Sequence, residues 1–387
     1  MRLLILHLAS VFGGAERTTS NLLRYLDRDR VTHVTLASTA ALRPFLPDRF
    51  DDFIDTAPHL PRGWFTDSRD LLRDARVAGA LIREAEPDLV LGMMHYSAAL
   101  AVFGTRLSRV PARTIGSFRG PVFEHMRHYE RGLRRRTFLR LAVGATARLA
   151  DRMIVPSRGT ADELRRHFLG ARERTVVIPN GIDNEEVALL AEEPTFGLEH
   201  LDPALPLLCV AARLSPEKDI GLLLEAFRRV QDVCPSALAI VGDGPECIAL
   251  ERLIDRWGLG ERVAFVGHRE NVYPYLRRAD LYVHTCKFEG FGYTMLEAMS
   301  CGTPVVATDC PYGPREVIGD DRFGLLVRPE DPLALADGIQ ALLLDPARRQ
   351  GLRDRGLERA QELSTARMAE RYGAVFADLM PPSIQDR

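Results

Sequence analysis

Short apolar runs alternate with longer amphipathic segments along most of the chain. Apolar runs of about four to eight residues are typical of strands buried on both faces, whereas apolar residues spaced three and four apart are typical of helices. In the first half, a helical pattern over residues 16–26 follows the first apolar run. The strand-like runs of this half are residues 3–9, 32–38, 88–94, 112–118, 151–157 and 175–180. Strands that alternate with helices predict a parallel sheet covered on both faces.

The same alternation restarts after residue 205. Helical patterns cover residues 219–232 and 246–257. The strand-like runs of the second half are residues 207–213, 237–244, 262–267, 280–285, 303–308 and 324–327. Because the pattern occurs twice, the sequence predicts an α/β protein with two doubly wound, Rossmann-like domains that face a cleft.

One stretch between the two patterns lacks periodicity. Residues 191–206, AEEPTFGLEHLDPALP, are acidic and contain proline, which predicts an interdomain linker there or just before it. We therefore expect a first domain over residues 1–187 and a second over 188–365. Residues 366–387 form a last segment, and we expect its helical part to pack back on the first domain. Ligands of such sheets bind beyond the carboxyl ends of the strands, so residues that follow strands are the candidates for a site.

Composition narrows the class of protein. A chain of 387 residues fits two domains better than one core. The net charge of −2 gives no overall attraction to nucleic acid, so any anion site must be local. No apolar run approaches the roughly 18 residues of a membrane span. The N-terminal run MRLLILHLASVFGGAE contains His7 and leads into a glycine turn, which favours a buried strand over a signal peptide.

The cysteines give no sign of a metal centre. All six lie in the second half, at positions 209, 234, 247, 286, 301 and 310. None forms a Cys-x-x-Cys pair, and no histidine lies beside them at zinc-finger spacing. This pattern favours buried, reduced thiols in a cytoplasmic protein over a disulfide framework or a metal site.

The first candidate motif is FGGAER at residues 12–17, which follows the first predicted strand and opens a helix. Gly13 and Gly14 would let backbone N–H groups approach an anion at the helix N-terminus. The motif is not GxGxxG, which disfavours a dinucleotide site of the Rossmann type. A tight turn without a ligand is the alternative.

The second candidate is VAARLSPEKDI at residues 210–220, which follows a strand and carries Arg213 and Lys218. A guanidinium group and an ammonium group on one loop together suit a diphosphate. The alternative is that both are exposed loop cations in water, and such a lysine would contribute little to stability.

The third candidate is IVGDGPE at residues 240–246, which ends a predicted strand with two glycines. Its single carboxylate is a poor magnesium site. A close approach of the backbone at Gly244 to a ligand is therefore the better interpretation.

The fourth candidate is CKFEGFGYTMLEAMSCG at residues 286–302, where Glu289 and Glu297 flank a Gly-Phe-Gly turn. A helix is predicted to begin near Tyr293 or Thr294, and the N–H groups of its first turn can hold a phosphate. Glu297 can accept hydrogen bonds from a ribose, and Glu289 lies where a second polyhydroxyl group would bind. The alternative is a solvated Glu289 and a Glu297 that only caps the helix or forms a salt bridge.

Together these motifs resemble the retaining glycosyltransferases of family 4, which have the two-domain GT-B fold. The resemblance spans the chain, and its last three motifs are the specific part. The motifs are GGAE (13–16), PNGID (179–183), RLSPEK (213–218), VGDGP (241–245) and the Glu-x7-Glu stretch FEGFGYTMLEAMSCGTPVV (288–306). The resemblance implies a nucleotide-sugar donor as co-substrate, with no cofactor and no metal.

The resemblance also implies roles for single residues. Arg213 and Lys218 would hold the donor diphosphate, and Glu297 would bind the ribose. Glu289 would hold the sugar hydroxyls and act at the reacting sugar. The other donor-binding positions are Gly13, Gly14, Gly244, His268, Arg269, Gly290, Phe291, Gly292, Tyr293, Thr294, Met295 and Leu296.

Two further observations refine the expected substrate site. DCPYGPREV at residues 309–317 resembles a subgroup that transfers hexoses or N-acetylhexosamines from UDP to lipid-linked or polysaccharide acceptors. Many family members carry a histidine where this chain has Arg119, in IGSFRGP. Arg119 is therefore a candidate catalytic cation beside the phosphate, and His95 is a second candidate. A structural role is the alternative for His95.

Residues 130–152, ERGLRRRTFLRLAVGATARLADR, form a basic, amphipathic helical pattern. Such a segment can lie on anionic lipid, which would place the protein peripherally on the cytoplasmic face of a membrane. A solvated helix face is the alternative.

The sequence thus predicts a metal-independent, retaining glycosyltransferase that moves a hexosyl or N-acetylhexosaminyl group to a glycan, lipid-linked or small-molecule hydroxyl. A GT-B sugar-nucleotide epimerase is one alternative, because it would share the donor site. A noncatalytic sugar-nucleotide or lipid-binding protein is the other.

Overall fold

The chain folds into two compact units. The computed structural model describes residues 1–8, 13–60, 67–130, 132–168, 171 and 173–380. One unit comprises Met1–Gly181 and the chain from Thr365 onwards, and the other comprises Ile182–Ser364.

The first unit is built on a seven-stranded parallel sheet in the order β3-β2-β1-β4-β5-β6-β7. Its strands are β1 (Arg2–His7), β2 (His33–Ser38), β3 (Asp52–Asp55), β4 (Leu89–Met93), β5 (Arg113–Ser117), β6 (Arg152–Val155) and β7 (Thr175–Val177). Every strand-like run predicted in this half forms a strand, although Ala9 of the first run lies outside the described residues. Only β3 was missed, because this short edge strand is no more than half-buried and begins and ends with aspartate.

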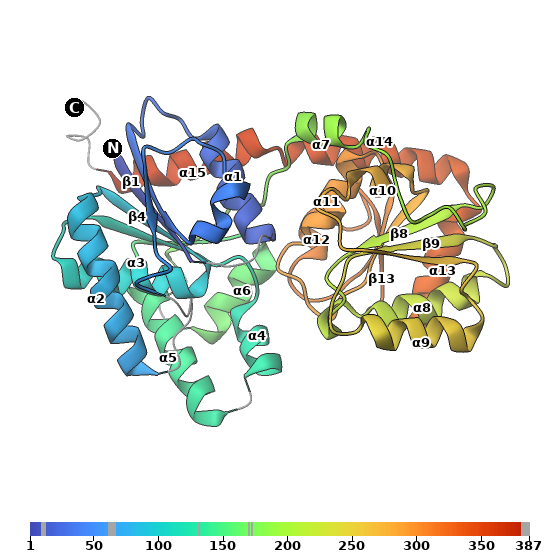
Figure 1. Ribbon diagram of the computed structural model, residues 1–387, viewed down its shortest axis with the longest axis horizontal. Helices are drawn as coiled ribbons and strands as arrows, with labels where there is room; N and C mark the ends of the chain where they lie inside the picture. The colour runs from blue at the N-terminus through green and yellow to red at the C-terminus, as the bar shows by residue number, and fades with distance from the viewer. Residues whose placement is uncertain (9–12, 61–66, 131, 169–170, 172, 381–387) are drawn as a thin grey trace. The chain divides into compact units, whose positions relative to one another are not determined.

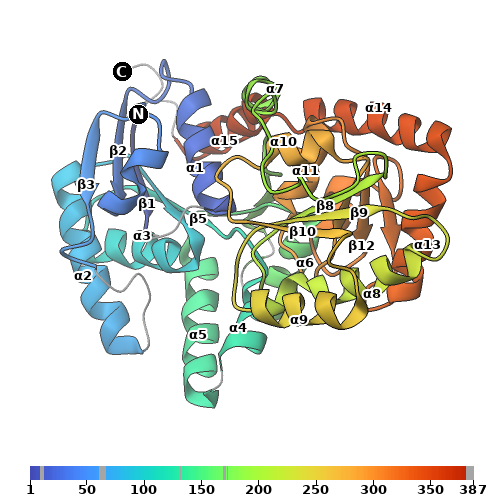
Figure 2. The ribbon, with the colours of Figure 1, turned by 45° about the vertical axis from the view of Figure 1, so that its right-hand side comes forward.

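Helices cover both faces of this sheet (Figures 1 and 2). Leu3 and Ile5 of β1 belong to one core and Leu4 and Leu6 to another, because successive side chains of a strand point to opposite faces. On the first face lie α1 (Gly14–Tyr25) and α15 (Thr365–Leu379). The second face holds α2 (Ser68–Ala85), α3 (Met94–Ser108), α5 (Leu133–Leu149) and α6 (Arg158–His167), and the remaining short helices are η1 (Ala40–Phe45) and α4 (Val122–Tyr129).

The C-terminal helix α15 is part of the first unit. It lies beside α1 (Figure 1) and buries Tyr372 and Phe376 in the core that both helices share. The Tyr372 hydroxyl also meets the end of β5, where it lies 3.3 Å from Ser117 Oγ. Burial of an aromatic side chain with a hydrogen-bonded hydroxyl anchors this helix although it is distant in sequence.

The second unit contains a six-stranded parallel sheet in the order β10-β9-β8-β11-β12-β13. Its strands are β8 (Leu207–Ala211), β9 (Ala237–Val241), β10 (Val263–Gly267), β11 (Leu281–His284), β12 (Val305–Thr308) and β13 (Leu325–Val327). Its helices are α7 (Asn184–Leu190), η2 (Pro216–Lys218), α8 (Ile220–Val230), α9 (Cys247–Trp257), α10 (Tyr273–Arg278), α11 (Tyr293–Ser300), α12 (Pro314–Ile318), α13 (Pro332–Leu343) and α14 (Pro346–Glu362). Helices α8, α9 and α13 pack on one face, and α10 and α11 pack on the other (Figure 1). The prediction of two doubly wound α/β units is confirmed.

The boundary between the units lies before residues 191–206 and not within them. Residues 191–206 belong to the second unit, and Leu198 and Leu201 are buried in its core. The backbone of Phe196 exchanges hydrogen bonds of 3.1 and 3.0 Å with the Tyr275 hydroxyl. Residues 191–206 lack periodicity because they lie along α10 as irregular chain. The chain enters the second unit earlier, at Ile182.

Within the described ranges, no helix has the length and apolar character needed to cross a membrane.

Candidate active site

In each sheet the strand order reverses between two central neighbours, and ligands of such sheets bind beyond the strand ends at this switch point. In the second unit, β8 and β11 are these neighbours. The loop after β8 carries Arg213 and Lys218, and the loop after β11 carries Glu289. The topology therefore brings together two motifs that are distant in sequence.

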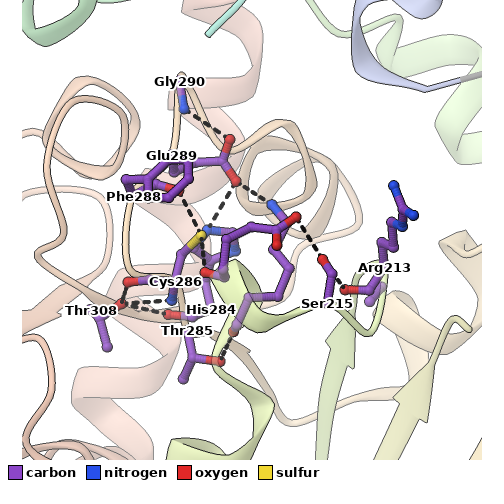
Figure 3. Close-up of polar contacts among 12 residues, drawn as sticks. Arg213, Ser215, His284, Thr285, Cys286, Phe288, Glu289, Gly290 and Thr308 are labelled. Carbon is purple, nitrogen blue, oxygen red and sulfur yellow. Dashed lines mark hydrogen bonds and ion pairs between the residues drawn. The ribbon is translucent and has the colours of Figure 1, made fainter. Parts of the chain in front are cut away.

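Lys218 and Glu289 form an ion pair at this point (Figure 3 shows the Glu289 side of it). Lys218 Nζ lies 2.5 Å from Glu289 Oε2, and the two side chains are only 22% and 18% exposed. Thr285 Oγ1 donates to the Lys218 carbonyl at 2.8 Å, which ties the lysine backbone to the end of β11. The alternative that Lys218 is an exposed loop cation is therefore excluded.

Burial and charge oppose each other in this pair. Burial raises the pKa of Glu289, but the charge of Lys218, the nearby His284 and hydrogen bonds from Lys218 and the Gly290 amide lower it to about 2. Burial lowers the pKa of Lys218, but the charge of Glu289 raises it well above its ordinary value. Both groups are thus held in their charged forms.

His284, the last residue of β11, lies under the pair. Its Nε2 atom is 3.7 Å from Glu289 Oε2, and its Nδ1 atom is 3.3 Å from the Tyr282 hydroxyl. Burial and the charge of Lys218 outweigh the attraction of Glu289 and lower the pKa of His284 to about 4. Sequence analysis missed His284, and the only signal was an unusual histidine in an apolar strand.

Cys286 connects the two loops. Its amide donates to Thr308 Oγ1 at 3.1 Å, and its thiol lies 3.0 Å from the Glu217 carbonyl oxygen and 2.9 Å from that of Phe288. Figure 3 shows Cys286 between Thr308 and Glu289. These contacts fix the backbone on both sides of the ion pair.

Arg213 occupies a different position from Lys218. Its side chain is exposed and points away from Glu289 (Figure 3). The two predicted diphosphate ligands share a loop, but only Lys218 lies in the ion pair.

The VGDGP turn holds that loop in place. Leu214 N donates to the Asp243 carbonyl at 2.9 Å, and Glu246 N donates to the Leu214 carbonyl at 3.0 Å. A Cβ atom on Gly244 would lie 2.3 Å from the Leu214 carbonyl oxygen, so only glycine fits there. The close approach predicted for Gly244 is thus made to the Arg213–Lys218 loop.

The turn after Glu289 leads directly into α11. Gly292 has a φ of +87°, and a Cβ there would meet Met295 Cε at 2.1 Å, so this position also requires glycine. Met295 N already donates to the Gly292 carbonyl at 3.1 Å. Phe291, Met295 and Leu296 are buried in the core, whereas Tyr293 and Thr294 are half-buried, and Glu297 lies one turn inside the helix and is 5% exposed.

The stretch DCPYGPREV supports Glu289 from the neighbouring strand end. Glu289 N donates to the Pro311 carbonyl at 3.2 Å. A Cβ atom on Gly313 would lie 2.7 Å from Phe291 N and 2.8 Å from the Glu289 carbonyl oxygen. This stretch, taken from the sequence only as a mark of a subgroup, therefore positions the Glu289 backbone.

His268 and Arg269 follow β10, on the other side of β9 from β8. His268 is exposed, and Arg269 Nε donates to the Tyr275 hydroxyl at 3.2 Å. The described contacts of Arg269 therefore direct it to α10 and not to the ion pair.

In the first unit, Arg119 follows β5, and both terminal nitrogens of its guanidinium group donate hydrogen bonds. It donates to the Tyr372 hydroxyl at 3.1 Å, to Thr18 Oγ1 at 3.4 Å and to Asn180 Oδ1. Asn180 belongs to the PNGID motif, so this motif and α15 together orient Arg119.

The GGAE motif precedes and opens α1. Gly13 is extended, with a φ of −161°, and Gly14 begins the helix. The motif's glutamate, Glu16, is buried with its Oε1 atom 3.1 Å from Nε2 of the buried His7, and Nδ1 of His7 lies 2.7 Å from Thr19 Oγ1. Sequence analysis missed this buried contact between His7 and Glu16. Phe12 of the predicted motif lies outside the described residues.

His95 lies in the first turn of α3, after β4, and is half-buried. Burial and the nearby His125 lower its pKa to about 4. It therefore occupies the switch point between β1 and β4 as a neutral imidazole at pH 7.

Known proteins match both halves of the chain. The family described as "Glycosyltransferase Family 4" matches residues 12–186, and the family described as "Glycosyl transferases group 1" matches residues 199–359. The chain is a glycosyltransferase family 4-like protein.

Individual relatives agree with this assignment. N-acetylgalactosamine-N,N'-diacetylbacillosaminyl-diphospho-undecaprenol 4-alpha-N-acetylgalactosaminyltransferase of Campylobacter jejuni is 28% identical over 57% of this chain and 58% of its own length. D-inositol 3-phosphate glycosyltransferase of Xylanimonas cellulosilytica is 32% identical over 52% of this chain and 51% of its own length. The chain thus matches little more than half the length of these two relatives.

Solved structures extend the similarity to the whole fold. HepE from Anabaena, in complex with UDP-glucose, has a TM-score of 0.77 at 22% identity, and the match covers 98% of this chain and 100% of HepE. Sucrose-phosphate synthase from Thermosynechococcus elongatus has a TM-score of 0.75 at 22% identity, and the match covers 98% of this chain and 99% of the synthase. The family 4-like protein therefore has the GT-B fold.

The depressed pKa of Glu289 predicts a pH-dependent contribution to the stability of this family 4-like protein. The carboxyl has an ordinary value of 4.5 and a folded value of about 2, so its stabilising contribution is complete above about pH 5 and is lost as the pH falls toward 2. The shift corresponds to on the order of 3 kcal/mol. The advantage of the wild type over Glu289→Gln in free energy of unfolding should therefore shrink between about pH 6 and about pH 3.

Urea unfolding at each pH measures this difference. Glu358→Gln, at an exposed position on α14, is the matched control for loss of a carboxylate. A difference between wild type and Glu289→Gln that does not vary with pH would contradict the assigned electrostatics.

Proposed function

We propose that this protein is a retaining, metal-independent glycosyltransferase that moves a hexosyl or N-acetylhexosaminyl group from a UDP-sugar to a hydroxyl of a glycan, lipid-linked sugar or small acceptor. The observation that carries the proposal is the half-buried Lys218–Glu289 ion pair at the switch point of the second sheet. A cation and a carboxylate fixed side by side suit a ligand that joins a diphosphate to a polyhydroxyl group.

The similar proteins support the choice of donor and acceptor. The HepE structures contain UDP and UDP-glucose, and the name of the Campylobacter relative describes a transferase acting on a diphospho-undecaprenol-linked sugar. By analogy, a uridine diphosphate sugar is the proposed donor and a lipid-linked or polysaccharide sugar is the preferred acceptor.

In the proposed reaction, negative charge gathers on the diphosphate as it departs. Lys218, Arg213 and the N-terminus of α11 near Thr294 would meet that charge. Lys218 is already fixed by its ion pair with Glu289, and a preorganised cation stabilises a transition state without reorganisation. This arrangement would make a divalent ion unnecessary for leaving-group stabilisation. Arg213 would have to turn toward the donor, because its side chain points away from Glu289 here.

Glu289 would act at the sugar. Its ionised carboxylate can orient the hydroxyls and stabilise positive character that develops on the anomeric carbon. The acceptor hydroxyl would attack from the side that the nucleotide leaves, which retains configuration. Gly290, Phe291 and Gly292 would present backbone groups to the sugar, and Glu297 would bind the ribose.

The other predicted site residues would contact the base, the sugar and the acceptor. His268 and Arg269 would lie near the base, and the first unit would bind the acceptor. Arg119, oriented by Asn180 and Tyr372, would act as a cation in place of the usual histidine, and neutral His95 would lie close to the sugar or acceptor.

Release of UDP from UDP-sugars tests the proposed function. The purified protein should release UDP from one UDP-hexose or UDP-N-acetylhexosamine, faster with a crude lipid or oligosaccharide acceptor, and the rate should persist in EDTA. Loss of turnover in EDTA would contradict the metal-independent mechanism. Acceptor-independent conversion of the sugar without UDP release would indicate an epimerase, and binding without turnover would indicate a noncatalytic protein.

Substitution of Glu289 and substitution of Glu297 should change different kinetic parameters. Ribose contacts are present both before and during reaction, so Glu297→Gln should mainly raise the donor KM. Positive character on the sugar appears only in the transition state, so Glu289→Gln should lower kcat with UDP affinity nearly intact. UDP affinity by calorimetry and kcat by UDP release give the comparison. The reverse pattern, with UDP binding lost in Glu289→Gln and only kcat lowered in Glu297→Gln, would interchange the two assignments.

We also propose that α5 lies on anionic lipid, which would make the protein peripheral on the cytoplasmic face of a membrane. Leu133 and Leu141 are 78% and 68% exposed and, eight residues apart, share one helix face. Arg136 and Arg140 are exposed within the same stretch. Exposed leucines among arginines are typical of helices at a lipid surface.

Removal of two charges from this face should weaken membrane binding. Each basic residue near an anionic surface contributes about 1 kcal/mol, so Arg136→Ser with Arg140→Ser should lower liposome affinity roughly 30-fold. Sedimentation with phosphatidylserine vesicles measures this, and turnover on a soluble acceptor should not change. Arg252→Ser with Arg256→Ser on α9 removes equal charge and is the control. An equal loss of liposome affinity in both double variants, or no loss in either, would show that this face of α5 is solvated and does not bind lipid.

A further inference from the structure

Three potential metal ligands meet at the end of β11. The nearest ligand atoms of His284, Cys286 and Glu289 all lie within 4.8 Å of one another. They come from different side-chain classes, namely an imidazole nitrogen, a sulfur and a carboxylate oxygen. Cys286 and His284 are buried, and Glu289 is partly exposed, so the cluster can be reached from the Glu289 side.

An orphaned ring nitrogen points into this cluster. His284 is 3% exposed, and its Nε2 atom is buried without a hydrogen-bond partner among the described residues. The Tyr282 hydroxyl donates to the Ala211 carbonyl at 3.4 Å, so it can accept from His284 Nδ1–H at 3.3 Å. A metal ion would bind the tautomer with its proton on Nδ1, in which the Nε2 lone pair is available 3.7 Å from Glu289 Oε2.

Lys218 already compensates the Glu289 carboxylate, so the His284 ring nitrogen is the atom of this cluster that lacks a partner among the described residues. Burial of an unsatisfied polar atom is unfavourable, and a bound ion would give this nitrogen a partner. Imidazole, thiolate and carboxylate together suit Zn²⁺, whereas Mg²⁺ prefers oxygen ligands only. The side chain of Cys310 also contacts Cys286, which places a second sulfur beside the cluster.

We propose that His284, Cys286 and Glu289 form an inhibitory site for Zn²⁺. The ion binds His284 Nε2, the Cys286 sulfur and a Glu289 carboxylate oxygen. The Cys286 S–H bond breaks, the sulfur keeps the electron pair and binds zinc, and the proton goes to solvent. Because Glu289 then binds zinc, its ion pair with Lys218 is broken. The inhibitory consequence rests on the proposed transferase function, but the binding does not.

Metal binding is tested directly on the full chain, with thiols reduced and bound metal first removed by a chelator. Zn²⁺ titration by calorimetry and Co²⁺ titration by absorption supply the probes. We expect one ion per chain and a thiolate-to-cobalt charge-transfer band. His284→Leu and Cys286→Ser should each weaken binding at least about tenfold, since even loss of an outer-shell partner costs about that much.

The chain offers a matched control. Cys247 on α9 has its thiol 3.7 Å from Glu251 Oε1, and this cysteine–carboxylate pair lies outside the cluster. Cys247→Ser should leave the affinity unchanged. Thermal unfolding checks each variant, and Cys286→Ser alone suffices if His284→Leu fails to fold. No charge-transfer band, or a band lost in Cys247→Ser and kept in Cys286→Ser, would overturn the site.

Measurements of UDP release distinguish a failure of the zinc site from a failure of the proposed transferase function. Zn²⁺ should inhibit UDP release reversibly, EDTA should restore it, and Mg²⁺ should have no effect. In Cys286→Ser the inhibitory concentration should rise at least about tenfold relative to its own uninhibited rate. Cobalt binding in a protein without transferase activity would support the site and contradict the transferase. Turnover that zinc does not inhibit would overturn the inference alone.

Discussion

The ion pair between Lys218 and Glu289 depends on contacts from four loops. Two charges with most of their side-chain surface out of water are stable only when they lie side by side, because desolvation of either one alone is expensive. The Lys218 backbone is held by Thr285, the Arg213–Lys218 loop by the turn at Gly244, and the Glu289 backbone by Pro311. The glycines at 244 and 313 allow these loops to approach more closely than any side chain would permit, and Gly292 adopts the positive φ of the turn into α11. The motif residues therefore supply the geometry that holds one charge pair largely out of water.

Much of this arrangement could be predicted from the sequence. The alternation of apolar runs with helical patterns identified every strand except β3, because buried parallel strands are apolar on both faces and stand out from their surroundings. The loops that follow β8 and β11 are candidates from the sequence, and the structure brings them together, since the carboxyl ends of parallel strands meet at one edge. The sequence predicts that the backbone at Gly244 approaches a ligand, whereas in the structure it approaches the Leu214 carbonyl of the chain itself.

Other features could not be predicted because they depend on tertiary contacts. The sequence leaves open whether Lys218 lies in water, because nothing local indicates the contacts that Thr285 and Glu289 make with it. The linker is predicted within residues 191–206 or just before them, and the sequence does not show that this stretch itself packs in the second unit, because irregular chain that packs on a helix has the composition of a loop. His284 was passed over, because in an apolar strand a single histidine carries no periodic signal. His7 and Glu16 form an internal pair that only the packing of α1 on β1 creates.

The central claim is that Lys218 and Glu289 act as one unit on the donor, and a double-mutant cycle on kcat tests it most directly. Lys218→Ala, Glu289→Gln and the double variant are compared with wild type in UDP release, with thermal unfolding as the check on folding. The account predicts that Lys218→Ala lowers kcat on the order of a hundredfold, as loss of one preorganised charge does. It also predicts that the double variant is little worse than the poorer single variant, because residues that act as a unit are not additive. An unchanged kcat in Lys218→Ala, or effects that multiply in the double variant, would contradict it.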